Sequence, residues 1–177
     1  MAITLDGTSG ITSAGTIADA TAVVRPLVSG TSQASTSGTS IDFTSIPSWV
    51  KRITVMLTGV STNGTSNPLI QIGSGTVATS GYLGSANNAS GASYVNYTTG
   101  FGIASANATN VLHGAMILTL VTGNTWIASH SVGASGGTAA SCGGGSVTLG
   151  GTIDRVRITT VNGTDAFDAG SVNILYE

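Results

Sequence analysis

The sequence predicts an all-β protein, built as an antiparallel jelly-roll-like sandwich with a short N-terminal arm. Three observations predict this fold class. Charged residues make up only 7% of the 177 residues and hydrophobic residues 41%, whereas about 25% of an average soluble protein is charged. The 26 glycines, together with abundant Ser and Thr, disfavour helices and suit short strands joined by polar turns. Apolar and polar residues also alternate along several segments, which is the period of a half-buried strand.

Residues 1–38 differ from the rest of the chain and are expected to form the arm, an attachment segment followed by a linker. Ile3 and Leu5 alternate with polar residues and predict one short strand, and Asp19 is a candidate start of a short helix. Gly30–Ser40 is rich in Ser, Thr and Gly, which is typical of a flexible linker or an extended arm. Two interpretations stay open: a partly ordered tail, or a segment that packs on another subunit.

Residues 39–177 are expected to form the sandwich itself, with about eight strands, because the length fits one domain. Within Val50–Ser61, the apolar side chains of Ile53, Val55 and Leu57 alternate with a second set, Arg52, Thr54, Met56 and Thr58, so one face is predicted to be buried. Dipeptides with strong turn propensity separate the predicted strands, at Asn63-Gly64, Gly123-Asn124 and Asn162-Gly163.

Between these strands, Gly73–Asn110 is a long segment rich in Gly, Ala, Ser and Asn. Long segments of this kind in compact domains are usually functional or disordered. Tyr82, Tyr94 and Tyr97 lie in it among small polar residues, a mixture that is typical of binding loops. We predict that these three tyrosines contact a ligand; the alternative is that they are core residues beneath a loop.

The charge distribution excludes several classes of partner. No charged residue occurs between Arg52 and Asp154, and the chain has only five Lys and Arg residues for a net charge of −2. Nucleic-acid binding and polybasic membrane attraction both require clustered Lys and Arg. The apolar run near Ala115–Val121 is broken by Thr119 and is far shorter than the ~20 residues that cross a bilayer. We therefore expect no nucleic-acid partner and no membrane insertion.

No catalytic residue, metal site or cofactor is predicted. The 73–78 segment matches a dinucleotide-binding fingerprint, but no helical pattern and no acidic residue follow it. His113 and His130 have no carboxylate near them in the sequence, and a two-histidine metal site needs further ligands. His130 is expected to be a hydrogen-bonded, half-buried histidine on the face of Trp126 and Val132. The single Cys142 excludes an intramolecular disulfide.

Several segments of the sequence resemble segments of bacteriophage tail-fibre and other virion proteins. They are MAITLDGTSGIT, IDFTSIPSWVKRITVMLTGVSTNGTS, PLIQIG, NTWIASHSVG and TIDRVRITTVNGTDAFDAGSVNILYE, of which the last is the most specific. The resemblance covers most of the chain. It implies a jelly-roll-like domain in a homotrimer, at an exposed position of the virion where host glycans are contacted. The absence of an export signal and of disulfides agrees with synthesis in the bacterial cytoplasm.

The expected function is therefore that of a non-enzymatic virion protein of the tail-fibre or tail-tip type. Residues 1–38 would attach it to other virion proteins, and a host surface glycan is the expected further partner. The alternative is a capsid decoration, cement or head-fibre protein that stabilises the shell. A free carbohydrate-binding or hydrolytic module is the third hypothesis.

Overall fold

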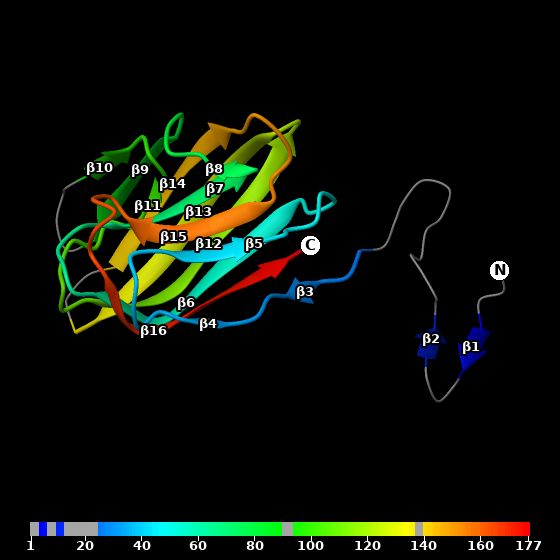
Figure 1. Ribbon diagram of the computed structural model, residues 1–177, viewed down its shortest axis with the longest axis horizontal. Coiled ribbons are helices and arrows are strands. Elements are labelled where there is room, and N and C mark those ends of the chain that lie inside the picture. Colours follow the sequence, from blue (N-terminus) through cyan, green and yellow to red (C-terminus); the bar gives the residue numbers. More distant parts are fainter. Residues whose placement is uncertain (1–3, 7–9, 13–24, 90–93, 137–139) are drawn as a thin grey trace.

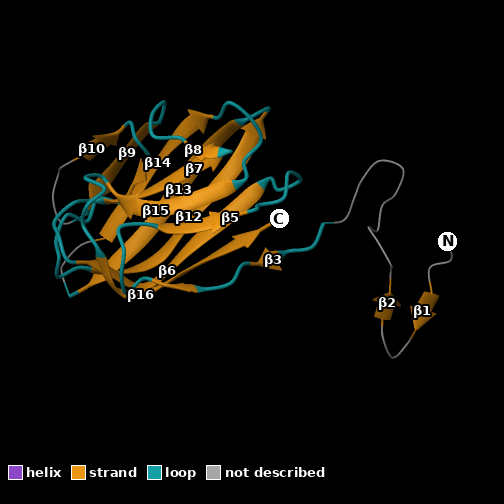
Figure 2. Cartoon of the chain, viewed as in Figure 1, coloured by secondary structure: helices purple, strands orange, loops and turns teal. Residues whose placement is uncertain are grey.

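The computed structural model describes residues 4–6, 10–12, 25–89, 94–136 and 140–177. This part of the chain is all-β, as the composition predicted, and every strand pairing in it is antiparallel. Two sheets lie face to face as a sandwich (Figures 1 and 2). No helix long and apolar enough to cross a membrane occurs in the described ranges.

The larger sheet has nine strands. Their order across the sheet is β10 (Tyr94–Tyr97), β9 (Leu83–Asn88), β14 (Ala140–Thr148), β13 (Thr125–Ser135), β12 (Val111–Thr122), β6 (Arg52–Thr62), β16 (Phe167–Tyr176) and β3 (Val28–Ser29). The ninth strand, β4 (Gln33–Ala34), also pairs with β16. Figure 1 shows β3 and β4 running along the edge of this sheet.

The smaller sheet has five strands. Their order is β11 (Phe101–Gly102), β7 (Pro68–Ser74), β15 (Arg155–Thr160) and β5 (Ile41–Thr44), with β8 (Thr76–Val77) paired to β7. A separate two-stranded sheet consists of β1 (Thr4–Asp6) and β2 (Gly10–Thr12). The strand expected around Leu5 is therefore present, whereas the helix start at Asp19 lies outside the described residues.

The core lies between the two sheets and follows the predicted alternation. In β6, Ile53, Val55 and Leu57 are buried, while the residues between them lie on the opposite face. From the smaller sheet, Ile72 and Ile158 join the same apolar cluster. Because both sheets contribute every second residue, the cluster removes a large apolar area from water, which is the main stabilising term of such a sandwich.

The segment that includes β3 and β4 corrects the predicted domain boundary. The Gly30 N–H donates to the Ile174 carbonyl at 2.7 Å, and the Ser35 N–H donates to the Gly170 carbonyl at 2.9 Å. The side chain of Ser35 is fully buried and donates to the Ala169 carbonyl. The flexible-linker interpretation of Gly30–Ser40 is therefore wrong for residues 30–35, which run as an extended arm along β16, and the sandwich begins near residue 28 rather than 39. Composition alone could not reveal this, because edge pairing uses backbone groups that every residue has.

Two of the predicted turns join the sheets instead of forming hairpins. Asn63-Gly64 leads from β6 in the larger sheet to β7 in the smaller one, and Asn162-Gly163 leads from β15 back to β16. The two loops contact each other, since the Ala166 N–H donates to Asn63 Oδ1 at 2.9 Å. Gly123-Asn124 does join the neighbouring strands β12 and β13, as expected.

Candidate functional site

Tyr82 lies in the core and not on a binding surface. It is 1% exposed, and its ring packs edge-on against Phe101 with 4.9 Å between the ring centroids. Its hydroxyl oxygen accepts the Ile72 N–H at 2.8 Å, and its O–H donates to the Ile72 carbonyl at 3.2 Å. Burial raises the pKa of the phenol to about 12. Tyr82 therefore ties the segment after β8 to the smaller sheet.

Tyr97 is also a core residue, whereas Tyr94 is exposed. Tyr97 is 4% exposed and packs with Leu69 and Ala86, while Tyr94 is 76% exposed. The two tyrosines are three residues apart on one strand, so their side chains point to opposite faces. The prediction that Tyr82, Tyr94 and Tyr97 form one contact surface is therefore wrong for Tyr82 and Tyr97. The segment that carries them is not a long loop, because it contains β8, β9, β10 and β11.

His130 faces the core, on the predicted side of its strand. It is 8% exposed, and its Nε2 lies 3.0 Å from Ser141 Oγ. The Ser141 oxygen accepts the Ala104 N–H at 2.9 Å, so its own proton is free to be donated to His130. Burial lowers the pKa of His130 to about 4, which keeps the imidazole neutral near pH 7. The pair is buried and none of its described hydrogen bonds involves a carboxylate, so it lacks the third group of a hydrolytic triad.

His113 lies on the opposite face of the larger sheet. Its Nδ1 accepts the Gly59 N–H at 3.3 Å, which leaves Nε2 to donate to Ser135 Oγ at 3.2 Å. The ring thus holds the β6 irregularity at Gly59 against β12. Within the described residues, no group of three or more His, Cys, Asp or Glu side chains is placed to hold a metal ion.

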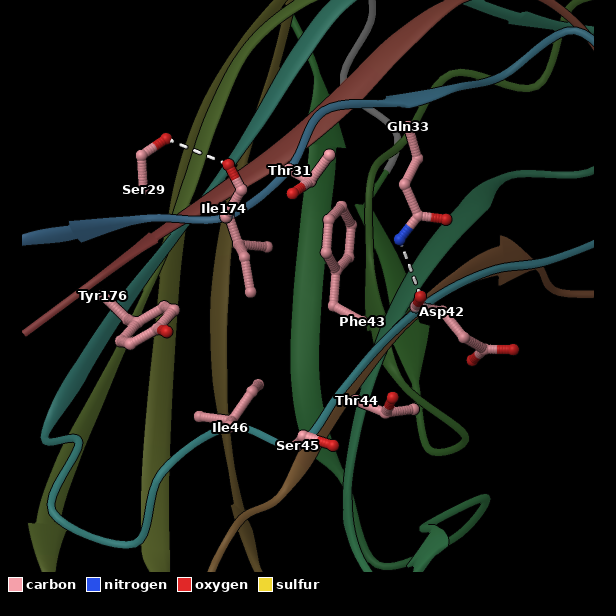
Figure 3. A pocket seen from close by; sticks show the side chains of 11 residues that line it. Ser29, Thr31, Gln33, Asp42, Phe43, Thr44, Ser45, Ile46, Ile174 and Tyr176 are labelled. Carbon is pink, nitrogen blue, oxygen red and sulfur yellow. Dashed lines mark hydrogen bonds between the residues drawn. The ribbon is translucent and has the colours of Figure 1, made fainter.

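A groove of about 560 Å³ opens between the edges of the two sheets. The β3–β4 segment and the end of β16 line one side, and β5 with the residues after it lines the other (Figure 3). Phe43, Ile46 and Ile174 are buried side chains of its lining. The polar lining residues are Ser29, Thr31, Gln33, Asp42, Thr44, Ser45 and Tyr176.

Two interactions fix the width and charge of this groove. Gln33 Nε2 donates to the Asp42 carbonyl at 2.7 Å and so joins the two sheet edges, as Figure 3 shows. The Asp42 carboxylate accepts two hydrogen bonds from Arg157, at 2.7 and 2.9 Å. This fork-like pairing is the strong geometry for an Arg–carboxylate pair. The negative charge at the groove is therefore matched by a positive one.

The groove ends near a small aromatic group. The rings of Trp49 and Tyr176 lie 6.0 Å apart at an angle of 51°, and the Arg25 guanidinium lies 5.4 Å from the Trp49 ring centroid. Ser45, at the rim, has a φ of 61° and is the one non-glycine residue with positive φ in the described part of the chain. Such backbone strain of about 1–3 kcal/mol persists only where the surroundings enforce it.

A second surface is the outer face of the larger sheet, which we define as the face turned away from the smaller sheet. Its side chains form rows across the strands, because paired residues share a face. One central row reads Tyr94, Asn87, Cys142, Ser131, Ala115, Met56 and Asn173. The next reads Asn96, Ser85, Gly144, Ser129, Ile117, Thr54 and Leu175. Neither row contains a charged residue.

The flanking rows extend this uncharged surface. On one side, Leu83 and Ile127 are exposed, and the row ends at Arg52, which pairs with Glu177 at 3.1 Å. On the other side lie Gly133, His113 and Thr58, among others. An exposed sheet face normally carries polar side chains at alternate positions. Here those side chains are small and almost all uncharged, which distinguishes this face from an ordinary solvent-exposed one.

Sequence reasoning found neither surface directly. The groove joins residues 29–46 to residues 174–176, and no local pattern links these segments. The uncharged stretch between Arg52 and Asp154 was visible, but only the strand order shows that it forms one continuous face. Compared with protein-family models, curated proteins and solved structures, the chain matches none of them.

Proposed function

We propose that this chain is a non-enzymatic structural protein of a bacteriophage virion, of the tail-fibre or tail-tip type. The sequence segments that resemble virion proteins support this proposal, and so does the antiparallel sandwich. The jelly-roll class and the homotrimer are parts of the same proposal. Because residues 28–35 belong to the sandwich, the attachment segment of the proposal is the chain before Val28.

The observation that carries the proposal is the uncharged outer face. Seven strands, which lie in the order β10, β9, β14, β13, β12, β6 and β16, contribute to it. At a strand spacing of about 4.8 Å and with four rows about 6.7 Å apart, its area is roughly 800 Å². A stable protein interface needs about 800 Å² on each partner. The face is therefore large enough to hold a permanent assembly together.

We assign neighbouring copies of the chain, arranged around the axis of the proposed homotrimer, as the occupants of this face. Contact between these copies brings together neutral surfaces, so neither desolvation of charge nor like-charge repulsion opposes it. Small residues such as Ser131, Ala115 and Gly144 make the centre of the face flat, while the larger side chains of Leu83 and Ile127 project from it. Assembly through a broad, rigid face is what a structural part of a particle requires.

The oligomeric state of the full chain tests this assignment. Ser131→Glu places a charge in the middle of the outer face and is expected to shift the protein from oligomer to monomer in sedimentation velocity. Thr164→Glu adds the same charge on an exposed loop between the sheets and is expected to leave the oligomer intact. A monomeric unmodified protein, or an oligomer that Ser131→Glu does not weaken, would contradict the role of this face.

The virion assignment is tested separately by the copy number of the chain in purified particles. Quantitative mass spectrometry is expected to find between three and a few tens of copies, which fits a tail position. Hundreds of copies would favour the alternative, a capsid decoration, cement or head-fibre protein. If the chain were absent from particles, the virion proposal would be wrong whatever its oligomeric state.

A further inference from the structure

We infer that Asn63 is a site of spontaneous covalent modification, at which the backbone nitrogen of Gly64 closes a ring on the side-chain amide and ammonia is released. The chain has two Asn-Gly dipeptides, Asn63-Gly64 and Asn162-Gly163, and a threonine follows the glycine in both. Both asparagines are exposed and lie in loops that join the two sheets. Because their sequence context is nearly the same, a difference in reactivity must come from the fold.

The reaction needs only water and hydroxide. Hydroxide removes the proton of the Gly64 N–H, and this nitrogen attacks Cγ of Asn63, which is less shielded because glycine has no Cβ. The new N–Cγ bond closes a five-membered succinimide, while the Cγ–Nδ2 bond breaks and Nδ2 leaves as ammonia with a proton from water. Water then opens the ring. Opening at Cγ leaves an aspartate at position 63, and opening at the backbone carbonyl leaves an isoaspartate.

The atoms that must meet in this reaction are available at Asn63. Among the described residues, neither the Gly64 N–H nor Asn63 Nδ2 has a hydrogen-bond partner. One hydrogen bond holds the side-chain amide, from the Ala166 N–H to Asn63 Oδ1 at 2.9 Å. An amide that is held at one atom can still rotate about its Cβ–Cγ bond, so Cγ can turn toward the glycine nitrogen.

The same atoms are held in place at Asn162. Its Oδ1 accepts hydrogen bonds from Thr160 Oγ1 at 2.8 Å, the Thr164 N–H at 3.0 Å and the Asp165 N–H at 3.1 Å. Its Nδ2 donates to Asp165 Oδ1, and the Gly163 N–H donates to the Thr160 carbonyl at 3.0 Å. Hydroxide cannot remove the Gly163 proton without breaking that bond, and an amide held at both ends cannot rotate. Modification of Asn162 therefore requires the loop to open first.

Packing between the two loops explains why the reactive dipeptide contains glycine. A Cβ at Gly64 would collide with the carboxylate of Asp165. Asn162 Nδ2 and the Ser66 N–H both donate to this carboxylate and hold it against Gly64. These hydrogen bonds hold the pKa of Asp165 below its ordinary range, so the carboxylate is too weak a base to replace hydroxide. The contact that protects Asn162 thus requires a glycine beside Asn63.

Either product changes the contact between the two loops. In the unmodified chain the Asn63 N–H donates to the Ala166 carbonyl, and Asn63 Oδ1 accepts the Ala166 N–H, both at 2.9 Å. An isoaspartate lengthens the backbone by one methylene at position 63, so these two bonds no longer match. Both products add a negative charge beside Asp165, which repels it. The change is irreversible, so the modified fraction increases with the age of the protein, and the modified chain should unfold at a lower urea concentration.

The test is incubation of the folded full chain, followed by peptide mass spectrometry and by enzymatic methylation of isoaspartate. Chymotrypsin is the protease, because trypsin has no site between Arg52 and Arg155. We expect Asn63 to be modified at least about tenfold faster than Asn162. Its rate should rise about tenfold between about pH 7 and about pH 8, because hydroxide removes the proton. In guanidinium, where the loops are unfolded, the two rates should agree within about threefold.

Two variants separate the effect of the fold from that of the sequence. Thr160→Val removes one donor to Asn162 Oδ1 with almost no change of shape. It should raise the Asn162 rate in the folded chain about threefold to tenfold and leave the Asn63 rate unchanged. Asn63→Gln keeps a side-chain amide but would have to close a six-membered ring, so position 63 should stay unmodified over the same time. If Thr160→Val does not fold, the comparison of the folded and unfolded unmodified chain decides alone.

Three results would overturn the inference. The first is equal rates at Asn63 and Asn162 in the folded chain. The second is an Asn63 that stays intact in the folded chain while it reacts in guanidinium. The third is a tenfold difference that persists in guanidinium, since the sequence and not the fold would then set the rates. None of these results bears on the virion proposal, which is decided by the composition of particles.

Discussion

The buried His130 should make the stability of this protein depend on pH between about 6.5 and 4. In the folded chain burial lowers its pKa to about 4, whereas the ordinary value is 6.5. Below pH 6.5 the His130 imidazole is protonated in the unfolded chain but stays neutral in the folded chain. The free energy of unfolding therefore falls as the pH falls. At about pH 5 the loss amounts to about 2 kcal/mol, since one pKa unit corresponds to about 1.4 kcal/mol.

Two carboxylates of the described residues are held out of this range by their hydrogen bonds. Hydrogen bonds from Arg155 and Asn162 hold the pKa values of Asp154 and Asp165 below their ordinary range. Those carboxylates therefore take up protons only at lower pH. The His130→Gln variant therefore isolates the part of the change between about pH 7 and 5 that comes from His130.

The assay is urea unfolding at about pH 7 and pH 5, at one fixed protein concentration, followed by the fluorescence of the buried Trp126. His130→Gln keeps an acceptor for the Ser141 hydroxyl but cannot titrate, so its free energy of unfolding should change far less between the two pH values. His113→Gln, on the exposed outer face, is the comparison variant, because it removes an imidazole without touching the buried His130–Ser141 pair. Equal losses in the unmodified protein and in His130→Gln would refute the reasoning. If His130→Gln fails to fold, an imidazole resonance that titrates near pH 6.5 instead of 4 would refute it.

Two further predictions concern the core and the N-terminal edge. Tyr82→Phe should lower the free energy of unfolding by about 1–3 kcal/mol, because the Ile72 N–H loses its partner. Tyr97→Phe should change the free energy of unfolding by less than about 0.5 kcal/mol or raise it, because the Tyr97 hydroxyl is buried with no partner among the described residues. Thermal unfolding of both variants measures this difference. Equal losses of stability in the two variants would contradict the prediction. A chain that begins at Ser37 should lose at least about 2 kcal/mol relative to one that begins at Arg25, because it lacks the strands and hydrogen bonds that cover the edge of β16. Urea unfolding of the two chains measures this, and equal midpoints would show that residues 28–35 add nothing to the sandwich.

Local patterns in the sequence determined the fold class and much of the core. Low charge and many small residues excluded helices, and the alternation in residues 50–61 identified Ile53, Val55 and Leu57 as buried. The same alternation placed His130 on the face of Trp126. These inferences succeeded because a strand exposes every second side chain to the same side, so a short stretch of sequence already contains the information.

The tertiary structure alone decided which strands are neighbours, and with that both candidate surfaces. The uncharged outer face depends on the strand order, and the groove depends on Gln33 meeting Asp42 across two sheet edges. Tyr97 is buried and Tyr94 is exposed because only one face of β10 is covered by the rest of the sandwich. The reason is physical: hydrogen bonds between strands join backbone groups that are the same in every residue, so pairing between distant segments is set by the packing of the whole sandwich and leaves little trace in any one segment.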